Sequence, residues 1–183
     1  SVTRICHGRG NVTLGELPPH PSQPAPIGEW DKLLALNWFH DVLWAKLAQA
    51  QAAFEDSPFN WYSGPEQPEL LIITSGTGWL YSVEAVEALQ LGDKAGILKL
   101  GCTWPLPEKL VLKYLEKSPR VFVVEEVDPV LEQNVANIIA HHPGLNIQLY
   151  GRYQRSALPQ SFELNPDVVI NALASVMNVT YQA

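Results

Sequence analysis

Three short stretches of this chain carry groups that do chemistry in other proteins. A glycine-rich turn, TSGTG, occupies residues 74–78, Cys102 lies in the loop GCTWPLP, and the carboxylates Glu125, Glu126 and Asp128 follow an apolar run. Glycine turns bind phosphate through backbone N–H groups, thiolates are nucleophiles, and paired carboxylates transfer protons. Each stretch is therefore a candidate site, and each also has a structural interpretation.

The glycine turn follows the apolar run 70–74 and precedes a segment whose apolar residues recur at helical spacing. Its glycines let the chain turn sharply, and Thr77 is the expected cap of the helix. The helix N-terminus would offer unpaired N–H groups to an anion. Because TSGTG matches neither the dinucleotide fingerprint nor the Walker loop, we favour a plain tight turn over a phosphate site.

The carboxylates have an ordinary explanation at a helix start. Asp128 followed by Pro129 is the expected N-cap and first residue of a helix. Acidic groups near a helix N-terminus gain about 0.3–1 kcal/mol each from its dipole. This explanation covers Asp128 fully and Glu125 and Glu126 in part, so we favour structure over catalysis for all three.

Cysteine and histidine give no stronger signal for a site. Cys102 has neither a second thiol nor a base beside it in the sequence, so we expect a small loop residue rather than a nucleophile. His141 and His142 precede Pro143 and a glycine, as residues at a helix end do. We therefore predict no catalytic residue and no metal site in this chain.

The elements around these stretches alternate between strands and helices. This alternation predicts an α/β fold, a three-layer αβα sandwich with a mostly parallel sheet. The final helix should start at Asn165 and Pro166, which repeat the cap-plus-proline pattern. Strands are expected at residues 70–74, 95–100, 121–124 and 146–150.

The carboxyl ends of these strands should meet at one edge of the sheet. Ser75, Gly101 and Glu125 mark the strand ends, and open α/β sheets bind their ligands at that edge. The edge is therefore the default site. The candidate cofactor-binding residues in its loops are Ser75, Gly76, Thr77, Thr103 and Glu126.

Two further segments precede the α/β domain, which we assign to residues 69–183. Residues 1–37 should form an extended arm, because PPHPSQPAP cannot form helix or pair in a sheet. Residues 38–68 should form a helix and an aromatic loop packed on the core. The helix, at 38–55 with Asn37 as its cap, must bury its apolar stripe. That stripe consists of Phe39, Leu43, Leu47, Ala50 and Phe54.

Composition excludes several functions. The chain has 183 residues, 46% of them hydrophobic, and a net charge of −7, so it builds one domain with an extension and does not suit nucleic acid. No apolar run approaches a membrane span. Two cysteines without a signal peptide ahead of them indicate the cytoplasm. The sequence begins without Met, and we expect a piece of a larger protein.

Three motifs carry a resemblance to a known family. They are IITSGTGWLYSVEAVEAL, GILKLGCTWPLPEKLVLKYL and VFVVEEVDPVLEQNV, and EDSPFN and LGELP upstream add to them. In combination they resemble the middle region of the alpha subunits of indolepyruvate ferredoxin oxidoreductases, in the thiamine-diphosphate-dependent 2-oxoacid:ferredoxin oxidoreductase family. The departures are Cys102, Trp104 and the proline-rich arm.

The resemblance implies a transketolase C-terminal-like domain between the pyrimidine-binding and diphosphate-binding domains of a larger enzyme. It implies a parent that decarboxylates aryl-pyruvates on thiamine diphosphate with Mg²⁺, passes electrons through [4Fe–4S] clusters to ferredoxin, and forms an acyl-CoA. Sibling domains and a second subunit are the implied partners, and a homo-oligomer stays open.

The family's chemical machinery is missing from the chain itself. The sequence has no GDG-type motif with a downstream Asn and no C-x-x-C-x-x-C run, and the activating glutamate belongs to another domain. Neither Glu125 nor Glu126 inherits that role. We therefore expect a catalytically silent structural domain with no cofactor of its own. One alternative is a free-standing nucleotide- or CoA-binding module. The other is a pure oligomerisation or assembly domain, which docks through the loop of Phe59, Trp61 and Tyr62 and through the proline-rich arm.

Overall fold

The computed structural model describes residues 4–7, 10–13, 29–160 and 163–181, with side-chain environments from residue 39 onward. The proline-rich stretch 18–26 lies outside these residues. The helices are α1 (Glu29–Glu55), α2 (Gly78–Ala88), α3 (Glu108–Leu115), α4 (Val130–His141) and α5 (Pro166–Met177). The strands are β1 (Arg4–His7), β2 (Gly10–Thr13), β3 (Trp61–Ser63), β4 (Leu70–Ser75), β5 (Ala95–Leu100), β6 (Arg120–Val124) and β7 (Gln148–Tyr150).

A five-stranded sheet in the order β3-β5-β4-β6-β7 forms the centre of the molecule. β4 pairs in parallel with both β5 and β6, and β6 pairs in parallel with β7. The edge strand β3 runs antiparallel to β5. Leu70 to Thr74 are completely inaccessible to solvent, as a strand covered on both faces requires.

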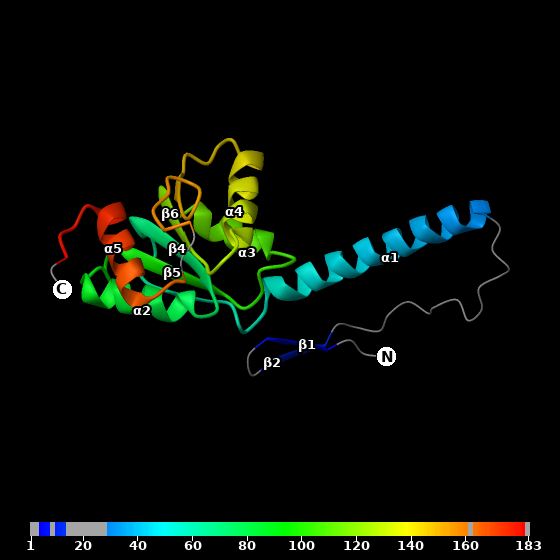
Figure 1. Cartoon of the computed structure of the whole chain (residues 1–183), viewed down its shortest axis with the longest axis horizontal. Helices are drawn as coiled ribbons and strands as arrows, with labels where there is room; N and C mark the ends of the chain where they lie inside the picture. Colours follow the sequence, from blue (N-terminus) through cyan, green and yellow to red (C-terminus); the bar gives the residue numbers. More distant parts are fainter. Residues whose placement is uncertain (1–3, 8–9, 14–28, 161–162, 182–183) are drawn as a thin grey trace.

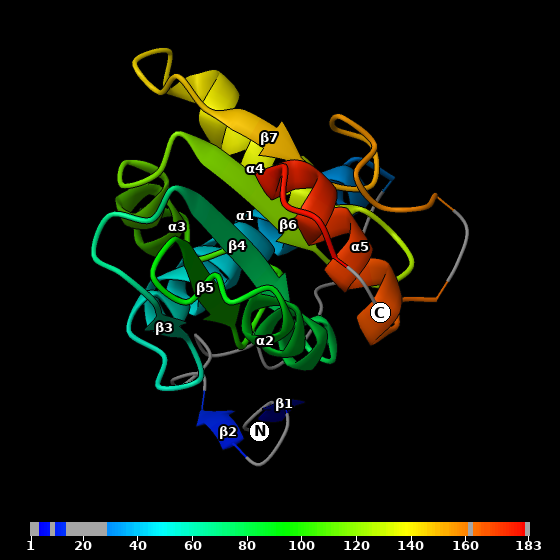
Figure 2. The same cartoon turned by 90° about the vertical axis from the view of Figure 1, so that its left-hand side faces the viewer.

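Two helices cover each face of the sheet (Figure 2). Leu70 and Ile72 of β4 face α2 and α5, whereas Leu71 and Ile73 face α3 and α4. This alternation follows from the two-residue period of a strand, which sends neighbouring side chains to opposite faces. The predicted three-layer αβα sandwich with a mostly parallel sheet is confirmed.

The start of α5 confirms its sequence pattern. The Asn165 side chain accepts a hydrogen bond from the Val168 N–H at 2.9 Å, and Pro166 begins the helix. The N-terminus of α3 is capped by a residue of another helix. The carboxylate of Glu55, at the end of α1, accepts the N–H groups of Lys109 at 3.0 Å and Leu110 at 2.8 Å.

α1 begins earlier than the sequence predicted. It starts at Glu29, so Asn37 lies inside the helix and is not its cap, and the first residues of α1 fall in the predicted arm. The physical reason is that no glycine or proline interrupts the chain between Gly28 and Pro58, and the leucines and alanines of this stretch favour helix.

The apolar stripe of α1 is buried only at its C-terminal end. Ala50 and Phe54 are 5% and 2% exposed, whereas Phe39 and Leu43 are both 50% exposed. Figure 1 shows the cause, because α1 runs out past the α/β body as a long projecting helix. Within the described residues, therefore, only the C-terminal end of the predicted stripe is buried.

The aromatic loop lies against the α/β domain. Tyr62 stacks on Tyr114 of α3 with 4.6 Å between ring centroids, and Trp61 meets Trp79 of α2 edge-on at 5.2 Å. Edge-on and stacked pairs at such distances add about 0.5–1.5 kcal/mol to the burial of the rings. Trp61 nevertheless stays 42% exposed.

Candidate functional site at the switch point of the sheet

The strand order creates a crevice between two neighbouring strands. β4 and β6 lie side by side, but α2 leaves β4 over one face of the sheet and α4 leaves β6 over the other. The two connections diverge at the carboxyl ends of these strands, and open α/β sheets bind ligands at such a switch point.

A cavity of about 360 Å³ occupies this crevice. All five edge-loop residues of the sequence hypothesis line it, so the structure brings them together; that they bind a cofactor remains a prediction. Gly101 is not among its lining residues, and its N–H is bonded to the Asn60 side chain at 2.9 Å. The cavity is lined by Ser75, Gly76, Thr77, Thr103, Glu125, Glu126, Val127, Asp128 and Val130.

The glycine turn shapes one wall of the cavity. Gly76 has φ of +55°, a left-handed conformation that glycine adopts at little cost. A Cβ on Gly78 would lie 2.7 Å from Thr74 Oγ1 and 2.8 Å from the Val124 carbonyl oxygen, so only glycine lets α2 approach the sheet this closely. Both glycines therefore have structural reasons.

Thr77 does not cap α2 as predicted. It occupies the N-cap position, but its side chain makes no capping hydrogen bond. The reason is its helical backbone, with φ of −69° and ψ of −27°, because a capping side chain reaches the helix amides from an extended residue.

Glu125 caps α4 in place of the predicted Asp128. Its two carboxylate oxygens accept the N–H groups of Leu131 and Glu132, each at 2.7 Å, and the residue is 7% exposed. Pro129 stands at the N-cap position without a side-chain bond. Glu126 and Asp128 are left exposed at the rim of the cavity.

Burial raises the pKa of the Glu125 carboxyl above its ordinary value. The neighbouring Glu132 carboxylate raises this pKa further by repulsion, whereas the two amide hydrogen bonds and the Arg152 guanidinium lower it. Desolvation outweighs these stabilising contacts because the charged form loses its water shell.

A second buried carboxylate holds the loop after β7, and sequence reasoning missed it. Glu132, 2% exposed, accepts the N–H of Arg152 at 2.8 Å, of Tyr153 at 3.1 Å and of Gln154. Arg152 reaches back with its guanidinium to the Glu125 carbonyl oxygen at 3.2 Å. Nothing at position 132 itself marks a buried charge, since glutamate is common in the first turn of a helix.

Val127 adds local strain at the rim. This β-branched residue has φ of +61° and is 71% exposed. A branched side chain is disfavoured in the left-handed region, and such strain often accompanies functional loops. The turn at Val127 directs the chain from β6 back into α4.

Cys102 and the histidines have structural surroundings. The Cys102 Sγ donates to the Trp104 carbonyl oxygen at 3.1 Å, and burial raises the pKa of its thiol. A thiol with a raised pKa stays protonated at neutral pH, which opposes nucleophilic chemistry. His141 and His142 lie at the end of α4, where each Nδ1 contacts the carbonyl oxygen four residues earlier at 2.8 Å.

The cavity offers hydrogen bonds rather than a reactive centre. Its hydroxyl groups come from Ser75, Thr77 and Thr103, and the N-terminus of α2 adds a partial positive charge. Among the described residues, no group of three or more His, Cys, Asp or Glu side chains is placed to hold a metal ion. In the same part of the chain, no helix is long and apolar enough to cross a membrane.

Comparison with known proteins identifies the relatives. No family model matches the chain. The indolepyruvate oxidoreductase subunit IorA of Pyrococcus abyssi is 31% identical over 98% of this chain, and that of Pyrococcus horikoshii is 32% identical over the same share. The chain matches a segment of IorA. It spans 28% of the length of these relatives, and the resemblance predicted from the three motifs is confirmed.

Solved structures agree on the fold. A 2-oxoglutarate:ferredoxin oxidoreductase from Magnetococcus marinus superimposes with a TM-score of 0.53, covering 81% of this chain and 23% of that one at 17% identity. A split-gene transketolase gives a TM-score of 0.51, covering 66% of this chain and 41% of its own at 17% identity. The predicted transketolase-like fold is confirmed.

Proposed function

We propose that this chain is a non-catalytic structural and assembly domain of a thiamine-diphosphate-dependent indolepyruvate ferredoxin oxidoreductase. The observation that supports this proposal most strongly is the match to IorA, which extends over 98% of this chain and only 28% of the relative. The parent would oxidatively decarboxylate aryl-pyruvates to acyl-CoA, with ferredoxin as electron acceptor. The division into segments 1–37, 38–68 and 69–183 belongs to the same proposal.

The Glu125 carboxylate and the Cys102 thiol make structural contacts, which supports a structural role for the domain. The Glu125 carboxylate is committed to the N-terminus of α4, and the Cys102 thiol is shifted toward its protonated form. A general base needs a free acceptor within reach of a substrate, and a nucleophile needs an activating base. Neither group meets its requirement.

The residues present do not fit the cofactors of the proposed parent. A [4Fe–4S] cluster is held by four thiolates, and the whole sequence has two cysteines. A diphosphate at the switch-point cavity would meet the carboxylates of Glu126 and Asp128, which repel it. We therefore assign thiamine diphosphate, Mg²⁺ and the clusters to other parts of the parent.

Partners and location follow from the same proposal. Sibling domains and a second subunit would contact this domain, whereas ferredoxin and CoA would be partners of the whole enzyme. We place the protein in the cytoplasm. A net charge of −7 opposes binding to nucleic acid.

The parent enzyme provides the direct test of this assignment. The complete polypeptide, purified with its second subunit, should reduce ferredoxin or a viologen dye when indolepyruvate and CoA are added. 2-Oxoglutarate at the same concentration is the control substrate and should give a much lower rate. Dye reduction with 2-oxoglutarate but not with indolepyruvate would contradict the substrate class.

A CoA- or nucleotide-binding module is the second candidate, and the switch-point cavity is the observation that favours it. The cavity combines the α2 N-terminus with three hydroxyl side chains, and the similar Magnetococcus structure is described with CoA bound. Calorimetric titration of the chain with CoA and with adenine nucleotides distinguishes the structural domain from the binding module. The structural proposal expects no heat of binding, and saturable heat that disappears in Thr77→Val would favour the module.

A further inference from the structure

The projecting part of α1 presents an apolar surface that none of the described residues covers. Leu43 and Trp44 are 50% and 59% exposed, and Leu43 lies on the same helical face as the buried Ala50 and Phe54. The face that packs on the body at one end of α1 therefore continues into solvent at the other. A long helix with such a face is stabilised mainly by packing, which indicates that something covers it.

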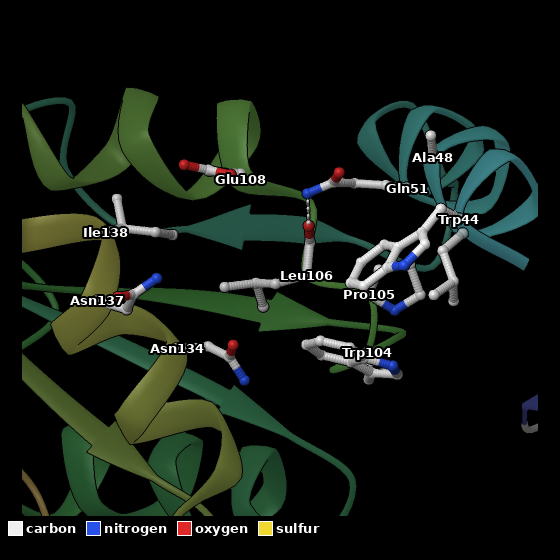
Figure 3. A pocket seen from close by; sticks show the side chains of 11 residues that line it. Trp44, Ala48, Gln51, Trp104, Pro105, Leu106, Glu108, Asn134, Asn137 and Ile138 are labelled. Carbon is white, nitrogen blue, oxygen red and sulfur yellow. Dashed lines mark hydrogen bonds between the residues drawn. The ribbon is translucent and has the colours of Figure 1, made fainter. Parts of the chain in front are cut away.

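The apolar surface continues across a groove beside the body. Figure 3 shows Trp44 of α1 and Trp104 of the loop on one side, and Asn134, Asn137 and Ile138 of α4 on the other. The groove has a volume of about 330 Å³, and Trp104 is 59% exposed. Two half-exposed indoles at one groove have the composition of an interaction hot spot.

Internal bonds leave this surface rigid and apolar. The Trp44 indole N–H donates to His40 Nδ1 at 2.8 Å, so its polar group is satisfied within α1. Gln51 donates to the Leu106 carbonyl oxygen at 2.9 Å, and Glu55 caps α3, which together fix α1 to the loop. The surface is thus held in place before any partner arrives, which lowers the entropy cost of binding.

The size of the surface decides what kind of partner fits. The helix face from residue 39 to residue 51 is roughly 20 Å long and about 10 Å wide, an area of roughly 200 Å². A stable interface between free proteins buries about 800 Å² on each partner. The described part of the face is smaller than such an interface, and like net charges of −7 oppose a second copy. A covalent tether, however, supplies an effective concentration of about a millimolar, at which small contacts persist.

We propose that the face of α1 formed by Leu43, Trp44 and Leu47, together with Trp104, docks an apolar surface of the remaining part of the parent polypeptide. This inference rests on the proposed function. The relatives support the tether, because the matched segment is 28% of their length and most of each polypeptide lies outside it. Gln51, Asn134 and Asn137 line the groove with amides that can pair with the backbone of an apolar segment, and the carboxylate of Glu108 lines the groove as well.

Hydroxyl-radical footprinting of the complete parent and of the 183-residue chain tests the docking. Labelling of Trp44 and Trp104 should be about fivefold or more lower in the parent, because the centre of an interface excludes water. Equal labelling in the two proteins would overturn the proposal. A drop in labelling of the 183-residue chain as its concentration rises, with a doubled mass in light scattering, would assign the surface to a second copy and overturn it as well.

Matched variants separate docking from folding. Trp44→Gln should leave the melting temperature of the 183-residue chain unchanged but raise the labelling of Trp104 in the parent toward that of the isolated chain. Leu80→Gln is the control, since Leu80 is 54% exposed on α2 and should change neither measurement. Unchanged protection of Trp104 in the Trp44→Gln parent would contradict the proposed contact.

Measuring the parent's activity beside the labelling distinguishes a failure of the docking proposal from a failure of the proposed function. Dye reduction by indolepyruvate with fully labelled Trp44 would overturn the docking surface and leave the function standing. Protection of Trp44 in a parent that does not oxidise indolepyruvate would overturn the function and leave the docking surface standing.

Discussion

Replacement of Glu132 by glutamine should destabilise the chain more than any exposed charge replacement. Three N–H groups of the loop after β7 converge on the Glu132 carboxylate, which is 2% exposed. Gly151 lies so close that a Cβ on it would be 2.4 Å from the Glu132 Cδ. The loop is therefore wrapped tightly around an acceptor that has two oxygens.

The magnitude follows from the bonds that glutamine cannot make. A glutamine amide replaces one oxygen with a donor, so at least one N–H of Arg152, Tyr153 or Gln154 loses its acceptor in either orientation. Hydrogen bonds to charged groups contribute about 1.5–3 kcal/mol each, so the free energy of unfolding should fall by about 3 kcal/mol.

Urea unfolding followed by tryptophan fluorescence measures this loss, provided that the m-value stays unchanged. Glu87→Gln on the exposed side of α2 is the matched control and should change stability by less than about 0.5 kcal/mol. A loss of stability in Glu132→Gln no larger than that of the control would contradict this expectation. It would mean that desolvation of the buried charge cancels the hydrogen bonds.

Three further outcomes are expected. Gly78→Ala should cost about 1–3 kcal/mol in urea unfolding, whereas Gly92→Ala, where the added methyl meets open space, should stay within about 0.5 kcal/mol. Because the pKa of Glu125 is raised, the stability that this residue contributes is complete below its unfolded pKa and is lost as the pH rises through its folded pKa. The wild-type chain should therefore lose stability relative to Glu125→Gln above about pH 4.5. A wild-type chain that gains stability relative to Glu125→Gln as the pH rises would oppose this. Cys102 should react with iodoacetamide at pH 7.5 more slowly in the folded chain than in urea, as measured by peptide mass mapping, and faster reaction in the folded state would contradict the raised pKa.

The layers of the fold could be predicted from the sequence because local signals and packing agree. The apolar run at residues 70–74 requires a strand buried on both faces, and β4 is that strand. Asn165 and Pro166 start α5 through a bond that spans three residues. Right-handed crossovers then bring Ser75 and Glu126 to one edge, which explains why residues distant in the sequence line the same cavity.

The caps could not be predicted because they come from residues outside the positions that a local capping pattern covers. Glu55 reaches α3 across more than fifty positions, and Glu125 caps α4 in place of Asp128. A local pattern identifies only a donor and an acceptor a few residues apart. The exposed stripe of α1 escaped prediction for a related reason, since periodicity marks a face that packs but not what it packs against.

Decarboxylation of indolepyruvate by the purified 183-residue chain shows directly whether this domain is catalytic on its own. The chain is incubated with thiamine diphosphate, Mg²⁺, CoA and a viologen dye, and released CO₂ and reduced dye are followed beside the complete parent enzyme. We expect turnover by the parent, and for the chain alone no CO₂ release above the rate measured without protein. Catalytic CO₂ release by the chain would contradict a non-catalytic structural domain.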